Sequence, residues 1–191
     1  MPRESVFRDD PIHIDTALQQ RIARINVAKT AKPIRRLRSK KRIIIDILCG
    51  KCSLAKYYLH HDSNAIIICI DRRDREDALS EIPRHMLARV RYVQLDAITL
   101  TYDALLDIIR SQCGGAGIKD VYHVHASPDC TTYSTAHSSA TSYRNDDGTI
   151  RSDMPRWRQT LARRHDKVMN TILSTVRMAC AKNTLLLATL E

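Results

Sequence analysis

The chain has 191 residues, of which 31 are Lys or Arg and 21 are Asp or Glu, so its formal net charge is +10. This length suits one domain of ordinary size, and 43% hydrophobic with 27% charged residues argues against a disordered chain. The longest apolar run, Ala65–Ile70, is far shorter than the roughly 20 residues that a membrane span needs. Because the N-terminus also lacks an apolar signal-peptide core, we expect an intracellular protein, cytoplasmic or nuclear, with six reduced cysteines.

The first 42 residues are expected to form a basic N-terminal helix and leader. Spacings of four and three between Leu18, Ile22 and Ile25 predict a helix over Asp15–Lys29. Residues 1–42 carry 12 basic and 4 acidic side chains, and the densest part, Lys29–Arg42, has eight basic and none acidic. Such a run is typical of a phosphate-contacting or nuclear-address segment, and equally of a solvated linker. On the first interpretation, the candidate nucleic-acid contacts are Lys29, Arg35, Arg36, Arg38, Lys40, Lys41 and Arg42.

Strands and helices alternate through residues 43–191, which we take as one domain. The predicted strands are Ile43–Leu48, Ala65–Ile70, Arg91–Leu95, Val121–Ala126 and Thr184–Leu190. The predicted helices are Ser53–His61, Tyr102–Arg110 and Trp157–Ala181, and the polar segment Ser127–Arg156 predicts a long functional or disordered loop. Alternation of this kind is typical of an α/β fold, a mostly parallel sheet with helices on both faces.

Ligands bind such sheets at the carboxyl ends of the strands, so the residues that follow each strand are the candidate site. Gly50 follows the first strand, where a glycine lets the backbone approach a ligand. Asp71 is placed to accept hydrogen bonds from ribose hydroxyls, although a strand-end acid is also explained as a cap of the next helix. Asp96 is placed to accept from an adenine amine. Cys130 follows the fourth strand, where a thiol of lowered pKa would be a nucleophile, although a free cysteine is more often a small buried residue.

Three segments together resemble DNA cytosine-5 methyltransferases, a family of class I S-adenosylmethionine-dependent enzymes. D-I-L-C-G-K-C-S at 46–53 is similar to the family's D-L-F-C-G-x-G-G motif. A-S-P-D-C-T-T-Y-S at 126–134 resembles the loop with the Pro-Cys nucleophile, particularly the S-P-P-C form of phage-type members, and L-A-T-L-E at 187–191 resembles the strand before the Glu-Asn motif. The chain departs from the family at Leu48, where the motif has Phe, at Cys52 and Ser53, where it has Gly, and at Asp129 and Thr131, where it has Pro and Gln.

The resemblance implies a class I methyltransferase-like, Rossmann-like sheet that is incomplete at its C-terminus, because the family's later arginine-bearing motif and target-recognition region are missing. It implies transfer of a methyl group from S-adenosylmethionine to carbon 5 of cytosine, with Cys130 as the nucleophile and Glu191 holding the base. The cofactor would be held by Asp46, Leu48, Cys49, Gly50, Asp71, Asp96 and Ser127. The implied partner is DNA, with RNA as an alternative, and a separate chain would supply the missing half; no metal and no membrane are expected.

Other interpretations remain open. The fold would also suit an inactive nucleic-acid-binding module, or an enzyme that methylates an exocyclic base amine with Tyr133 as its aromatic residue. Cys49 and Cys52 form a C-x-x-C pair, typical of a thioredoxin-like redox site, and with His60 or His61 they would form a partial zinc site. His123 and His125 are expected to face opposite sides of their strand, so that at most one reaches a site.

Overall fold

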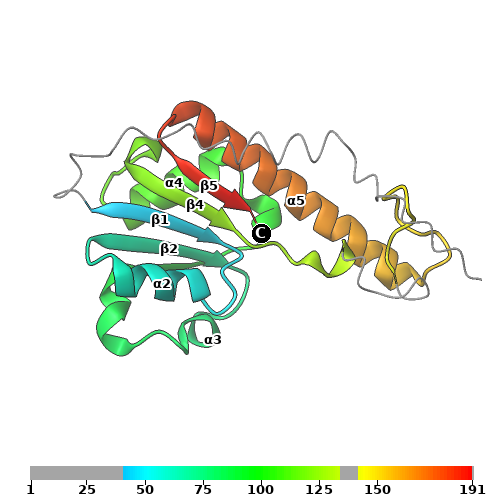
Figure 1. Cartoon of the computed structure of the whole chain (residues 1–191), viewed down its shortest axis with the longest axis horizontal. Helices are drawn as coiled ribbons and strands as arrows, with labels where there is room; N and C mark the ends of the chain where they lie inside the picture. The colour runs from blue at the N-terminus through cyan, green and yellow to red at the C-terminus, as the bar shows by residue number, and fades with distance from the viewer. Residues whose placement is uncertain (1–40, 134–141, 191) are drawn as a thin grey trace, which may run out of the picture.

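The structure is a computed structural model that describes residues 41–133 and 142–190 (Figure 1). The predicted helix over 15–29, the basic run as far as residue 40, and Glu191 lie outside the described residues. Helix labels therefore begin at α2.

Five strands form one sheet in the order β3-β2-β1-β4-β5, and every neighbouring pair is parallel (Figure 1). The strands are β1 (Arg42–Ile47), β2 (Ala65–Asp71), β3 (Val90–Gln94), β4 (Val121–Ala126) and β5 (Leu187–Leu190). The predicted α/β class is therefore confirmed as a Rossmann-like fold. β5 is shorter than predicted, because the segment before it turns at Asn183, whose carbonyl accepts from the Leu186 N–H at 3.1 Å.

Helices cover both faces of the sheet: α2 (Ser53–His61) and α3 (Arg75–Leu79) on one side, α4 (Tyr102–Gln112) and α5 (Arg156–Lys182) on the other. Side chains alternate along β1, so Ile43, Ile45 and Ile47 pack with α4 and α5, while Ile44 packs with α2 and α3. Every one of these isoleucines is at most 3% exposed, as expected for a parallel strand covered on both faces. Among the described residues, none of the helices combines the length and apolar character of a membrane span.

Two histidines of β4 share one face of the sheet, which corrects the expectation that they face opposite sides. Side chains two residues apart in a strand point the same way. His123 and His125 each lie 2.8 Å from the hydroxyl of Thr189 on β5, and Tyr58 of α2 lies 2.7 Å from the other ring nitrogen of His123. Both histidines are buried, so this chain of polar contacts joins α2, β4 and β5 inside the fold.

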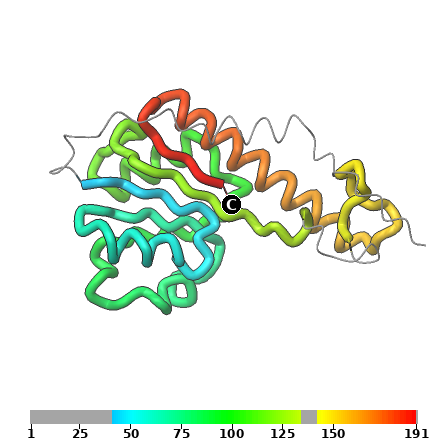
Figure 2. Tube along the Cα trace, viewed as in Figure 1, coloured from blue at the N-terminus to red at the C-terminus, as the bar shows by residue number. Residues whose placement is uncertain are grey.

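The second half of the predicted loop packs against the first half of α5. Tyr143 and Met154 pack with Ala162 of α5 in a small apolar cluster separate from the two cores of the sheet. Figure 2 shows this segment, residues 142–155, curling around the start of α5 beyond the end of the sheet. The loop therefore has a core of its own in this part, which its polar composition did not predict.

Candidate functional site

The residues after β1, β2 and β4 meet at one edge of the sheet. The Leu48 N–H donates to the Ile70 carbonyl at 2.8 Å, and the Ser127 N–H donates to the Ile47 carbonyl at 3.2 Å. The Leu95 N–H in turn donates to the Asp71 carbonyl at 2.9 Å, which extends the pairing of β2 with β3. Among the described residues, Leu48, Asp71 and Ser127 are thus brought to one edge, as expected for a parallel sheet.

The β1–α2 loop, Leu48–Cys52, has an unusual backbone. Leu48, Gly50 and Cys52 all have positive φ angles, of 58°, 53° and 58°. This left-handed region suits glycine and costs other residues free energy, on the order of 1–3 kcal/mol each. Nothing lies within 4 Å of where a Cβ on Gly50 would be, so the space beside its backbone is open.

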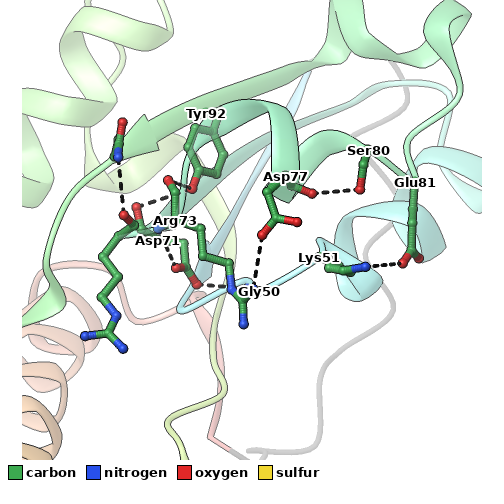
Figure 3. A network of polar contacts seen from close by, with 10 residues as sticks. Gly50, Lys51, Asp71, Arg73, Asp77, Ser80, Glu81 and Tyr92 are labelled. Atoms are coloured by element: carbon green, nitrogen blue, oxygen red, sulfur yellow. Dashed lines mark hydrogen bonds and ion pairs between the residues drawn. The ribbon is translucent and has the colours of Figure 1, made fainter.

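Asp71 holds this loop in place (Figure 3). One carboxylate oxygen accepts from the Gly50 N–H at 2.9 Å and the other accepts from the Arg73 N–H at 3.0 Å. The Tyr92 hydroxyl donates to the Arg73 carbonyl at 2.7 Å and fixes the same turn. Asp71 is 5% exposed. Its carboxylate therefore braces the loop, and two of roughly four lone-pair positions remain for a ligand.

Asp96 is tied to α5. Its carboxylate accepts from the Ile98 N–H at 3.2 Å and forms an ion pair with Arg164. Although partial burial disfavours its charge, the Ile98 N–H and the Arg164 guanidinium hold the pKa of Asp96 below its ordinary value. Sequence analysis missed Arg164, because 68 residues separate it from Asp96 and only the packing of α5 brings the two together.

Cys130 begins a single 3₁₀ turn, Cys130–Thr132, directly beyond β4. All six cysteines lie in the described part of the chain, and Cys130 is the one that is exposed. Asp129, which stands where the related motif has proline, caps this turn by accepting from the Thr131 N–H at 2.8 Å. The hydrogen bond from the Thr131 hydroxyl is the main reason that the pKa of Asp129 lies below its ordinary value.

Side chains from α5 and from residue 144 support the Cys130 turn. The Arg144 guanidinium donates to the Thr132 carbonyl at 3.0 Å and to Asp166 at 2.6 Å. The Tyr133 hydroxyl also donates to Asp166 at 2.6 Å, and Arg144 lies over the Tyr133 ring, 4.3 Å from its centre. His165 lies 3.0 Å from the Thr132 hydroxyl. Arg144, His165 and Asp166 were not predicted as site residues, because no local motif marks them.

The two described residues of the predicted basic segment lie away from this edge. Arg42 begins β1, at the opposite end of the strand from the candidate site. Its guanidinium forms a 3.1 Å ion pair with Asp62 and lies over the Tyr122 ring. Lys41 precedes it and is exposed. Near the candidate site, the positive charge comes instead from the first half of α5, where residues 156–167 include five basic side chains and one acidic side chain.

Three buried thiols also meet near this edge, on the α2 side of the sheet. The Sγ atoms of Cys49, Cys52 and Cys69 all lie within 4.8 Å of one another. His60 and His61, the zinc ligands considered from the sequence, are exposed in the last turn of α2 and do not belong to this group. The other predicted cofactor residue, Asp46, is 2% exposed and pairs in register with Cys69 and His125 inside the sheet.

Comparison with known proteins assigns no family. No protein-family model matches the chain, and no curated protein matches it. A crystal structure of a protein of Streptococcus pneumoniae TIGR4, provisionally assigned as an NADH-flavin reductase, is 11% identical over 78% of this chain and 70% of that chain, with a TM-score of 0.29. Because this similarity is too low to assign a fold or a function, the fold is assigned from the strand order and the registers of the sheet itself.

Proposed function

We propose that this chain transfers a methyl group from S-adenosylmethionine to carbon 5 of cytosine in DNA, with Cys130 as the covalent nucleophile. One observation carries the proposal: the exposed Cys130 lies in the segment that leaves β4, and this segment begins beside the open β1–α2 loop, where the Ser127 N–H donates to the Ile47 carbonyl. A ligand cradle and a nucleophile at adjacent strand ends are what a two-substrate transfer reaction in this fold requires.

The residues of the β1–α2 loop fit the proposed cofactor. The space beside Gly50 would admit the methionine end of S-adenosylmethionine against the backbone of Leu48–Gly50. Asp71 keeps acceptor positions for the ribose hydroxyls, and Asp96, whose side chain is 36% exposed, would accept from the adenine amine beside Arg164. When bound, the cofactor would supply an electrophilic methyl group.

The residues at the strand ends would make cytosine reactive. The Cys130 thiolate would attack carbon 6 of the ring, and the electron pair of the 5,6 double bond would then be available at carbon 5. Glu191 would hold ring nitrogen 3 and the exocyclic amine, stabilising the charge as it develops. After carbon 5 is methylated, loss of its proton restores the double bond and expels the Cys130 thiolate. The base must leave the duplex to be reached from its face, at about a few kcal/mol.

The surroundings of Tyr133 favour carbon 5 over an exocyclic amine as the acceptor. An enzyme of the second kind needs an aromatic side chain free to contact the base. The Tyr133 hydroxyl is bonded to Asp166 and one face of its ring is covered by Arg144. This side chain is therefore occupied in supporting the Cys130 turn.

The test is methyl transfer from labelled S-adenosylmethionine to duplex DNA, followed by mass analysis of the nucleosides. We expect 5-methylcytosine from the full chain, and a loss of about 1,000-fold or more for Cys130→Ser. DNA that contains 5-fluorocytosine should trap the protein covalently, because fluorine cannot leave carbon 5 as the proton does. Cys180→Ser is the matched control, because Cys180 is half-buried near the end of α5, and it should keep full activity.

Three results would contradict the proposal. Undiminished transfer by Cys130→Ser would remove the nucleophile. A methylated exocyclic amine would identify the other acceptor, and methylated RNA with unmodified DNA would identify the other nucleic acid. If calorimetry detects no binding of S-adenosylmethionine, the chain is not a methyltransferase, and the alternative of an inactive nucleic-acid-binding module is favoured.

A further inference from the structure

The three buried thiols belong to two neighbouring strand ends. Cys49 and Cys52 lie in the β1–α2 loop, where the Cys52 N–H donates to the Cys49 carbonyl at 2.7 Å, and their Sγ atoms are 3.7 Å apart. Cys69 comes from β2 and completes a triangle of sulfur atoms. Their exposed fractions are 8%, 0% and 0%, so bulk water does not reach the sulfurs of Cys52 and Cys69.

Packing alone is a poor explanation for Cys52. A buried free cysteine usually serves as a small apolar residue. At Cys52, however, φ is 58°, a conformation that glycine adopts without strain and that other residues adopt at a cost on the order of 1–3 kcal/mol. The strain at this position is therefore better explained if the side chain does more than pack, and it ends 3.7 Å from another sulfur.

The geometry suits a metal ion held by three sulfurs. Three thiolates placed around one ion at a metal–sulfur distance of about 2.3 Å lie about 4 Å apart, which the 3.7 Å contact and the 4.8 Å limit accommodate. Among residues 41–133 and 142–190, no histidine or carboxylate joins the group as a fourth ligand. Structural zinc sites take four ligands, whereas a set made only of thiolates selects soft ions.

We propose that Cys49, Cys52 and Cys69 bind one soft, thiophilic metal ion, with monovalent copper as the best match to the three sulfurs that the described part of the chain supplies. Binding forms three metal–sulfur bonds and releases the thiol protons to solvent, with no change in oxidation state. The bound ion would join the β1–α2 loop to β2 beside the backbone bonds that already connect them. This proposal shares the β1–α2 loop with the methyl-transfer proposal, but it can be tested apart from it, because it uses the thiol of Cys49 and needs neither Cys130 nor a second substrate.

The experiment is an anaerobic titration of the reduced full chain with monovalent copper against a chromogenic copper chelator. We expect one equivalent per chain by native mass spectrometry, three sulfur neighbours by X-ray absorption, and a higher thermal unfolding midpoint for the loaded protein. Cys69→Ala should weaken the affinity about tenfold or more. Cys180→Ser is the matched control and should bind as the unchanged chain does.

Cys52→Gly separates a ligand from a packing residue. Glycine relieves the backbone strain at this position, which offsets part of the free energy lost with a buried side chain, so the metal-free variant should still fold, yet it should lose the copper-dependent rise in unfolding midpoint. If Cys52→Gly or Cys69→Ala binds copper as tightly as the unchanged chain, the proposal is wrong. Tighter binding of zinc than of copper, with four neighbours around the ion, would also overturn the three-coordinate assignment.

Discussion

His123 is a buried imidazole whose charged form the fold disfavours. Burial is the main reason that its pKa falls from 6.5 to about 4, and the neighbouring His125 adds to the effect. The other groups around it are the Tyr58 phenol of α2 and the Thr189 hydroxyl of β5, both within hydrogen-bond distance, with Asp46 beside His125 in register. Burial also raises the pKa of Tyr58, to about 12, so the phenol stays neutral at ordinary pH.

This histidine should make the folded state sensitive to mild acid. Between pH 6.5 and 4 the unfolded chain binds a proton that the folded chain does not, so stability falls as the pH is lowered through this window and levels off below it. From pH 7 to 5 the loss from this one group should be about 2 kcal/mol. Urea unfolding at each pH measures it, and His123→Gln should show a shallower slope by that amount. Equal slopes for the two proteins would show that His123 does not titrate in this way.

The positions of single site residues could be predicted where the residue lies at the end of a strand that the sequence itself marks. Asp71 ends the apolar strand β2 and Ser127 directly follows β4, and a parallel sheet brings such positions to one edge. Arg164 and Cys69 could not be assigned in this way. The contact of Arg164 depends on how α5 lies against the sheet, and that of Cys69 on which face of β2 its side chain takes.

Arg144 is the point where three elements join. Its guanidinium reaches the Thr132 carbonyl, the Gly148 carbonyl at 3.0 Å and Asp166 of α5, so the Cys130 turn, the loop and the helix share one planar donor. The Arg144–Asp166 pair is partly buried, with side-chain exposures of 15% and 35%, so it should be worth more than a surface ion pair.

Arg144→Lys should loosen these elements without unfolding the sheet. Lysine keeps the charge but cannot bond three partners in one plane, so opening of residues 130–133 and 142–151 should become easier by about 1–3 kcal/mol. Hydrogen exchange should show faster amides there and unchanged amides in β1 and β4. Arg110→Lys, at an exposed pair with Asp107 on α4, is the control and should alter neither region. Protection of 130–133 that persists in Arg144→Lys would contradict this role.

Whole elements were predicted better than their connections. β1, β2 and β4 are short runs of mainly buried residues between polar turns, and their bounds agree with the predicted ones to within a residue. The short helix α3 lies in a charged stretch for which no element was predicted, because only Ala78 is buried in it. The segment 142–155 was predicted as loop, since its small core depends on Ala162 in the next helix.

At the scale of the molecule, positive charge is unevenly spread over residues 43–191. These residues hold 19 basic and 17 acidic side chains and are nearly neutral as a whole, but the first half of α5 concentrates basic residues near the candidate site. Arg163 and Lys167 line an open groove of about 590 Å³ between the start of α4 and α5. Trp157, near the start of the helix, is 61% exposed. Cations with an exposed aromatic side chain are a combination that binds nucleic-acid backbones and unpaired bases.

If α5 contacts phosphates as the proposed function requires, removing two of its charges should change the salt dependence of DNA binding. For Arg163→Gln with Lys167→Gln, the slope of log affinity against log salt should decrease by about two, nearly one for each lost phosphate contact.

The control is Lys119→Gln with Lys182→Gln, which removes the same charge from exposed positions near the amino ends of β4 and β5. The control should keep the slope of the unchanged chain, because those lysines lie at the other edge of the sheet. Any contribution of the basic leader is common to all three proteins and cancels in the comparison. Equal slopes for the two double variants would place the phosphate contacts outside the first half of α5 and refute this surface.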